Sequence, residues 1–117
     1  MRTVIVVLAV LCLSATSAHA SDTRLSDLWA QVERDEVSFT SADASAQRYI
    51  DAKDTAFAIR SLRSAVDVVR HQMEVLDSLI VAEQDLDRQT SALVRQGVAR
   101  ERLAKAVEMI ALLHTHR

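Results

Sequence analysis

The sequence contains no proline, one glycine, one cysteine and four aromatic residues among 117. Sheet-rich folds place glycine and proline at their turns, so this scarcity argues against them and favours helices. Sixteen acidic against 14 basic residues exclude the strongly basic surface of a nucleic-acid-binding protein. Without glycine-rich loops there is no phosphate cradle and no nucleophile elbow. The composition therefore predicts an all-α protein that is not an enzyme.

The first twenty residues have the three parts of a secretory signal peptide. Arg2 supplies the positive start, residues 4–13 are apolar, and the segment Ala18-His19-Ala20 ends in small residues suited to cleavage. An apolar core of ~10 residues is short against the ~20 that a membrane-spanning helix needs. We therefore expect cleavage after Ala20 and a periplasmic or secreted protein.

Cleavage would leave a single domain, residues 21–117, without any cysteine, because Cys12 lies in the signal segment. Arg2 is the only charged residue removed, so 13 basic and 16 acidic residues remain and the formal net charge becomes −3. A secreted chain of this kind has no disulfide framework and no thiolate site. Packing alone must stabilise so small a domain, and oligomerisation would help.

The apolar spacing predicts three helices, over residues 22–36, 41–95 and 98–116. Residues 37–41, Val-Ser-Phe-Thr-Ser, combine β-branched side chains with serines that compete for backbone hydrogen bonds, which favours a break there. No glycine or proline interrupts the next 55 residues, and Gly97 has the character of a helix stop. The expected architecture is an elongated three-helix protomer with coiled-coil-like packing. A bend near residues 67–71 would instead give a four-helix bundle.

The central segment carries the clearest apolar pattern. Seven residues recur at steps of three and four, as in the seam of helices that pack at shallow angles: Ile59, Leu62, Val66, Val69, Met73, Leu76 and Ile80. Outer helices of ~15 and ~19 residues would leave the middle of a ~55-residue helix uncovered. We therefore expect these seven residues to bind a partner, either a second copy of the chain or another helical envelope protein.

Histidines at the C-terminus offer the one candidate for cofactor chemistry. His114 closes the apolar stripe of the last predicted helix, and His116 follows it two residues later. Residues two apart point to different sides of a helix, so both would bind one metal only if the helix end frayed. A haem- or metal-binding bundle that uses these histidines is the alternative function, although we expect no cofactor.

The leading expectation is an exported, non-enzymatic helical protein that acts as an interaction or assembly subunit, or as an adaptor, in an envelope complex. Arg95, Arg100, Arg102 and Lys105 give a modest basic cluster that would allow contact with a membrane surface. In an antiparallel hairpin the same cluster would pair with the acidic run at residues 83–87.

Overall fold

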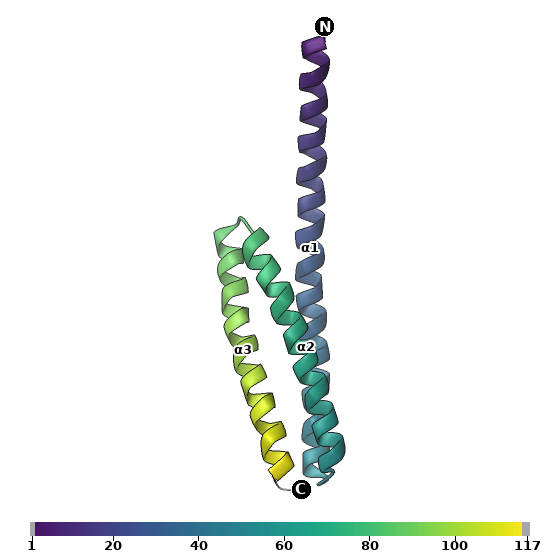
Figure 1. The fold of residues 1–117 in the computed structure, drawn as a ribbon, viewed down its shortest axis with the longest axis vertical. Helices are drawn as coiled ribbons and strands as arrows, with labels where there is room; N and C mark the ends of the chain where they lie inside the picture. The colour runs from purple at the N-terminus through teal and green to yellow at the C-terminus, as the bar shows by residue number, and fades with distance from the viewer. Residues whose placement is uncertain (1, 116–117) are drawn as a thin grey trace.

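A computed structural model describes residues 2–115, with side chains from residue 22 onward. The three helices are α1 (Arg2–Asp51), α2 (Thr55–Ala82) and α3 (Leu86–Thr115), as Figure 1 shows. They pack against each other and form an all-α bundle, so the predicted fold class is confirmed. The predicted signal peptide and the predicted ligand His116 lie outside the residues whose side chains are described.

The second helix is the centre of the bundle. It runs back along α1, and α3 then returns along α2, so that α2 packs on both neighbours (Figure 1). Among the described residues no Cα atom of α1 lies within 8 Å of a Cα atom of α3. Within residues 22–115, no helical stretch is both long and apolar enough to cross a lipid bilayer.

The hydrophobic core lies along α2. Val69, Leu76 and Leu79 are fully buried and pack with Val32 of α1. The third helix contributes small buried residues, namely Ala92, Ala99 and Ala106. Because alanine has no side chain beyond Cβ, these positions let α3 lie close to α2, and the large residues of α2 supply most of the apolar volume.

The predicted break at residues 37–41 is wrong, because α1 continues through it to Asp51. The hydroxyl of Thr40 donates to the carbonyl of Glu36 at 2.9 Å, four residues earlier, and so does not compete with the helix. Phe39 packs against the core. Tertiary packing thus outweighs the weak helix propensity of this segment.

The first turn instead occupies residues 52–54. The N–H of Lys53 donates to the carbonyl of Ile50, and the N–H of Asp54 donates to that of Tyr49, which together form a Schellman motif. Lys53 has a φ of 60°, in the left-handed region that this motif requires. The Asp54 carboxylate then accepts from the N–H of Phe57 at 3.3 Å and begins α2.

The second turn, residues 83–85, is also built without glycine. The Asp85 carboxylate accepts from the N–H of Asp87 at 3.2 Å and caps the start of α3. The side-chain amide of Gln89 donates to the carbonyl of Ile80 at 2.8 Å near the end of α2. Two local aspartate caps, at Asp54 and Asp85, therefore divide the segment that the sequence predicts to be one helix.

The predicted stop at Gly97 is wrong as well, because α3 runs through this residue from Leu86 to Thr115. Packing of Ala92 and Ala99 on α2 holds the helix on both sides of it. The alternative bend near residues 67–71 does not occur either, since α2 is continuous from Thr55 to Ala82. The predicted helices 22–36, 41–95 and 98–116 are thus replaced by three helices with different ends.

Candidate partner-binding groove between α1 and α3

A groove runs between α1 and α3, with α2 as its floor, and three hollows follow one another along it. The upper hollow, of about 690 Å³, is lined by Asp22, Leu25, Ser26, Trp29, Arg88 and Ser91. The middle hollow, of about 260 Å³, is lined by Glu33, Glu36, Gln72, Arg95, Val98 and Arg102. The lower hollow, of about 590 Å³, is lined by Phe39, Asp43, Gln47, Leu62, Arg102, Lys105, Ala106, Glu108, Met109 and Leu112. We call this surface the α1/α3 groove.

Trp29 anchors the upper end of the groove. Its indole Nε1 donates to the Glu83 carboxylate at 3.1 Å. Glu83 is only 6% exposed, and its other oxygen accepts from the N–H of Asp85 at 3.3 Å. A buried carboxylate needs such donors, because an unpaired charge away from water is costly. The contact therefore fastens α1 to the turn between α2 and α3.

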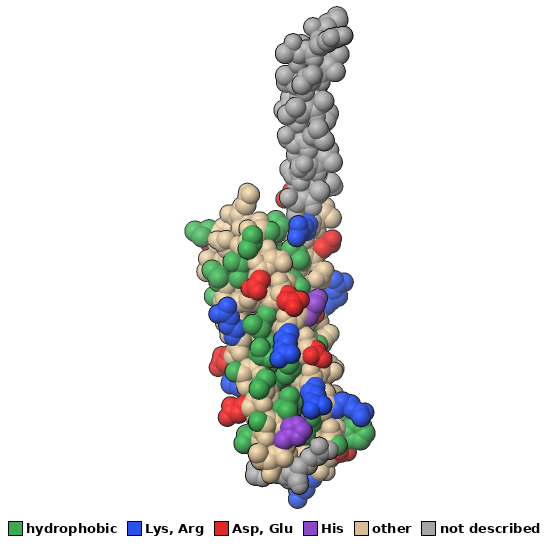
Figure 2. Space-filling model, in the orientation of Figure 1, with side chains coloured by type: hydrophobic (Ala, Val, Ile, Leu, Met, Phe, Trp, Pro, Cys, Tyr) green, Lys and Arg blue, Asp and Glu red, His purple; other side chains and the backbone are tan. Residues whose placement is uncertain are grey.

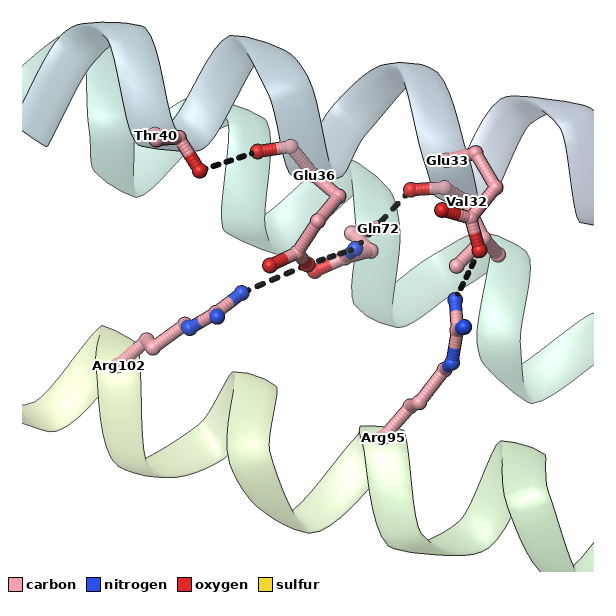
Figure 3. Close-up of polar contacts among 7 residues, drawn as sticks. All are labelled: Val32, Glu33, Glu36, Thr40, Gln72, Arg95 and Arg102. Carbon is pink, nitrogen blue, oxygen red and sulfur yellow. Dashed lines mark hydrogen bonds and ion pairs between the residues drawn. The ribbon is translucent and has the colours of Figure 1, made fainter.

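Two arginines of α3 cross the middle of the groove, as Figure 3 shows. Arg95 reaches Glu33 of α1 at 2.5 Å, and Arg102 reaches Glu36 at 2.7 Å. Arg95 and Arg102 are seven residues apart, so they project from the same face of α3. Since the backbones of α1 and α3 do not approach each other, these long side chains supply direct polar contacts between the two helices. We call these two ion pairs the arginine bridges.

Each arginine bridge also lies against an aromatic ring of α1. The guanidinium of Arg95 is 5.7 Å from the centroid of the Trp29 ring, and that of Arg102 is 4.7 Å from the centroid of the Phe39 ring. A guanidinium at this distance from an aromatic face gains a cation–π attraction. The same arginine therefore binds a carboxylate and covers an apolar ring, which fixes its orientation across the groove.

The floor of the groove contributes one buried amide. The Nε2 of Gln72 donates to the carbonyl of Val32 and to the Glu36 carboxylate, both at 3.2 Å (Figure 3). Glu36 thus accepts hydrogen bonds from α2 and from α3 at once. The Arg102 guanidinium, which donates to this carboxylate, holds the pKa of Glu36 below its usual range, and Gln72 acts in the same direction. The pKa of Arg102 is raised in turn by its hydrogen bond to Glu36.

The lowered pKa of Glu36 predicts a loss of stability in acid. A carboxyl whose pKa is lower in the folded chain stabilises the fold above its unfolded value of 4.5, and this contribution disappears as the pH falls through the folded pKa. Glu36→Gln is expected to lower the free energy of unfolding by no more than about 1 kcal/mol at neutral pH, because water screens the pair. Below the folded pKa the variant and the parent should be equally stable. Urea unfolding across this pH range measures both effects.

Glu74→Gln is the matched control, because Glu74 is exposed on α2 and takes no part in the arginine bridges. Its effect on stability should not follow the same pH dependence. A constant difference between Glu36→Gln and the parent at every pH would show that Glu36 does not act through its charge.

Charges of opposite sign face each other across the groove. The wall formed by α1 carries four acidic residues, Asp22, Glu33, Glu36 and Asp43, and no basic residue among those that line the hollows. The wall formed by α3 carries Arg88, Arg95, Arg102 and Lys105, with Glu108 as its one acidic residue. A molecule that lies in the groove would therefore meet a negative wall on one side and a positive wall on the other.

The seven residues predicted to bind a partner lie inside the chain's own bundle. Ile59, Leu62, Val66, Val69 and Leu76 are buried, and Met73 and Ile80 are partly buried against the core. The expectation of an uncovered surface is therefore corrected. It depended on short outer helices, whereas α1 and α3 both extend along the whole of α2. The wide apolar face of α2 contacts two neighbours within one chain.

Of the two candidate histidines, His116 lies outside the described residues, and His114 belongs to no cluster of three or more metal-binding side chains within residues 22–115. His114 lines a hollow of about 240 Å³ together with Ala56, Ile59, Arg60 and Arg63, so two arginines of α2 lie on the same hollow. His71 lies on α2, 2.7 Å from the Asp35 carboxylate. Residues 22–115 hold no group of three or more metal-binding side chains. The positive surroundings of His114 oppose the binding of a cation there.

Sequence reasoning places the basic residues of α3 opposite the wrong partners. The structure pairs Arg95 and Arg102 with α1, whereas the acidic run at 83–87 caps the turn and binds Trp29. The seven-residue spacing of the two arginines, with acidic residues on one face of α1, is the signal that points to the arginine bridges.

No protein-family model matches the chain, and neither does any of the curated proteins or solved structures with which it was compared.

Proposed function

We propose that this protein is an exported, non-enzymatic interaction subunit that binds an amphipathic helix of a partner protein in the α1/α3 groove. The observation that carries the proposal is the row of hollows between α1 and α3, whose backbones each pack on α2 and stay apart from one another while side chains cross between them. A fourth helix would complete a four-helix bundle by filling this space. The export part of the proposal depends on residues 1–20, which have the pattern of a signal peptide.

The lower hollow favours a helix as the occupant. Its lining combines the apolar side chains of Phe39, Leu62, Met109 and Leu112 with charged residues at the rim. Leu112 is 46% exposed although it is aliphatic. Grooves that bind amphipathic helices present this combination of apolar floor and polar rim. The walls add a preference for orientation, because basic residues of the partner would face α1 and acidic residues would face α3.

The length of the groove suits a long helical segment. It extends from Asp22 to Gln47 along α1, which at ~1.5 Å per residue is roughly 38 Å. The arginine bridges lie in the middle hollow, between the upper and lower hollows, and so leave both ends of the groove open. The partner helix would pack over the guanidinium groups and place apolar residues above and below them.

A photo-crosslinking amino acid at Met109 tests the proposal in cells that export the chain. We expect covalent capture of a partner through a segment whose sequence has helical apolar periodicity and charges of opposite sign on its two flanks. A peptide of that segment should bind the purified chain, and Leu112→Glu should weaken this binding by at least about tenfold.

Val81 provides the matched control, since it is an exposed aliphatic residue on α2 outside the groove. A crosslinker at Val81 should not capture the same segment, and Val81→Glu should leave binding of the peptide unchanged. Capture of a segment without amphipathic pattern, or full binding by the Leu112→Glu variant, would contradict the proposal.

A further inference from the structure

The outer face of α3 carries a second regular pattern that the fold of one chain does not use. Eight residues recur along it at alternating steps of four and three, and all eight are exposed: Leu86, Thr90, Leu93, Gly97, Arg100, Ala104, Val107 and Ala111. This is the spacing of a heptad seam. The face that α3 turns to α2 is a different one, formed by Ala92, Ala99 and Ala106. We call the eight exposed residues the outer seam.

Large apolar side chains are exposed along the outer seam. Leu86 is 72% exposed, Leu93 is 53% exposed and Val107 is 48% exposed. In the view of Figure 2, hydrophobic side chains gather at the surface at the end of the bundle where α2 passes into α3. A row of exposed aliphatic residues at heptad spacing is typical of a surface that another helix covers.

Side-chain size alternates along the outer seam. One set of positions, seven residues apart, holds the large side chains of Leu86, Leu93, Arg100 and Val107. The other set, also seven apart, holds the small side chains of Thr90, Gly97, Ala104 and Ala111. A helix that packs on this seam would need large residues opposite the small ones and small residues opposite the large ones.

The outer seam of a second copy meets this requirement when the two α3 helices run antiparallel. In antiparallel coiled coils each layer pairs the two different seam positions of the heptad. Leu86 then faces Ala111 of the second copy, Leu93 faces Ala104, Arg100 faces Gly97 and Val107 faces Thr90. Every layer joins a large residue to a small one, and the two-fold axis repeats each layer. We propose that the protein forms a homodimer through this antiparallel pairing of α3.

Gly97 gives independent support, because the fold of one chain does not need a glycine there. Its φ is not positive, and a Cβ atom at this position would meet nothing within 4 Å. Glycine inside a helix destabilises it relative to alanine. Close approach of another helix is a physical reason to keep glycine at such a position. In the dimer the stem of Arg100 from the second copy occupies the open space above Gly97.

Charge favours the antiparallel arrangement over the parallel one. A parallel pair in register would place Arg100 against Arg100 of the second copy, with like charges inside the seam. In the antiparallel pair the guanidinium of Arg100 passes Gly97 of the second copy. It then reaches Glu101 of that copy, one helical turn further along. Lys105 contacts only Oε1 of that carboxylate, at 3.5 Å, so the other oxygen can accept from Arg100. The α1/α3 groove stays open, because its lining residues and the outer seam are different sets.

Sedimentation of the chain purified after export tests for the dimer. We expect a reversible monomer–dimer equilibrium over micromolar concentrations. Gly97→Gln should weaken dimerisation by at least about tenfold, because its side chain blocks close approach, while it raises the stability of the monomer as a better helix former. Weaker dimerisation together with a more stable monomer would distinguish loss of the contact between the two copies from a folding defect. A monomer at every concentration would overturn the proposal.

Cysteine crosslinking tests the register, in a chain with Cys12→Ser so that no other thiol is present. A Leu93→Cys chain mixed with an Ala104→Cys chain should form a disulfide-linked pair on mild oxidation. Each variant alone should not crosslink efficiently, because residue 93 then faces Ala104 and not its own counterpart. Efficient crosslinking of each variant alone, without crosslinking of the mixture, would show a parallel pair and contradict the proposal.

Discussion

Replacing Leu76 with alanine is expected to lower the free energy of unfolding by about 3 kcal/mol. Leu76 is fully buried in the centre of α2 and belongs to the cluster that joins the helices. Its truncation removes apolar contacts and leaves a cavity, because close-packed neighbours relax only in part. Urea unfolding followed by circular dichroism measures the change. For a small domain this is a large share of the total stability.

Leu86→Ala is the matched control for the Leu76 variant, since it removes the same atoms from a leucine that is 72% exposed in one chain. At concentrations where the protein is monomeric, it should change the stability by less than about 0.5 kcal/mol. Equal losses for the two variants would show that α2 does not form the core of the bundle.

Replacing Trp29 with phenylalanine is expected to cost about 2 kcal/mol, the second largest effect of a single change. Phenylalanine keeps most of the ring but lacks the N–H that donates to Glu83 at 3.1 Å. The buried carboxylate then loses one of its two donors, and the remaining one is the backbone N–H of Asp85. The loss should appear as a lower urea midpoint with an unchanged slope.

A double-mutant cycle with Glu83→Gln isolates the hydrogen bond from the change in ring size. Because the neutral amide is less costly to leave without the indole, Trp29→Phe should cost less in the Glu83→Gln background than in the parent. Equal costs in both backgrounds would show that the indole N–H contributes nothing through Glu83, and that Trp29 stabilises the fold by packing alone.

The fold class follows from composition, but the ends of the helices do not. Asp54 and Asp85 begin helices, whereas Asp43 and Asp67, which carry the same side chain, lie inside them. Local propensity differs too little among such positions to decide where a chain turns. Packing decides it, and here Phe39 holds α1 together where the sequence favours a break.

The candidate groove could not be read from the sequence, because it depends on the register between α1 and α3. Moving the turn from Gly97 to residues 83–85 changes which acidic residues Arg95 faces. The sequence does predict the apolar seam of α2, because its periodicity is local. What covers that seam depends on the lengths of α1 and α3. The sequence predicts turns at residues 37–41 and at Gly97, which would make both outer helices too short to cover it.

The arginine bridges make the opening of the α1/α3 groove depend on two side chains. Neighbouring helices usually keep a fixed separation because their backbones are held apart by close-packed core residues. Here α1 and α3 are each held by packing on α2, and the space between them is crossed by long side chains with several rotatable bonds, at the partly exposed pairs Arg95–Glu33 and Arg102–Glu36. Rotamer changes of this kind occur within nanoseconds at exposed positions. The passage between the upper and lower hollows can therefore open or close with the rotamers of Arg95 and Arg102, while the core along α2 stays unchanged.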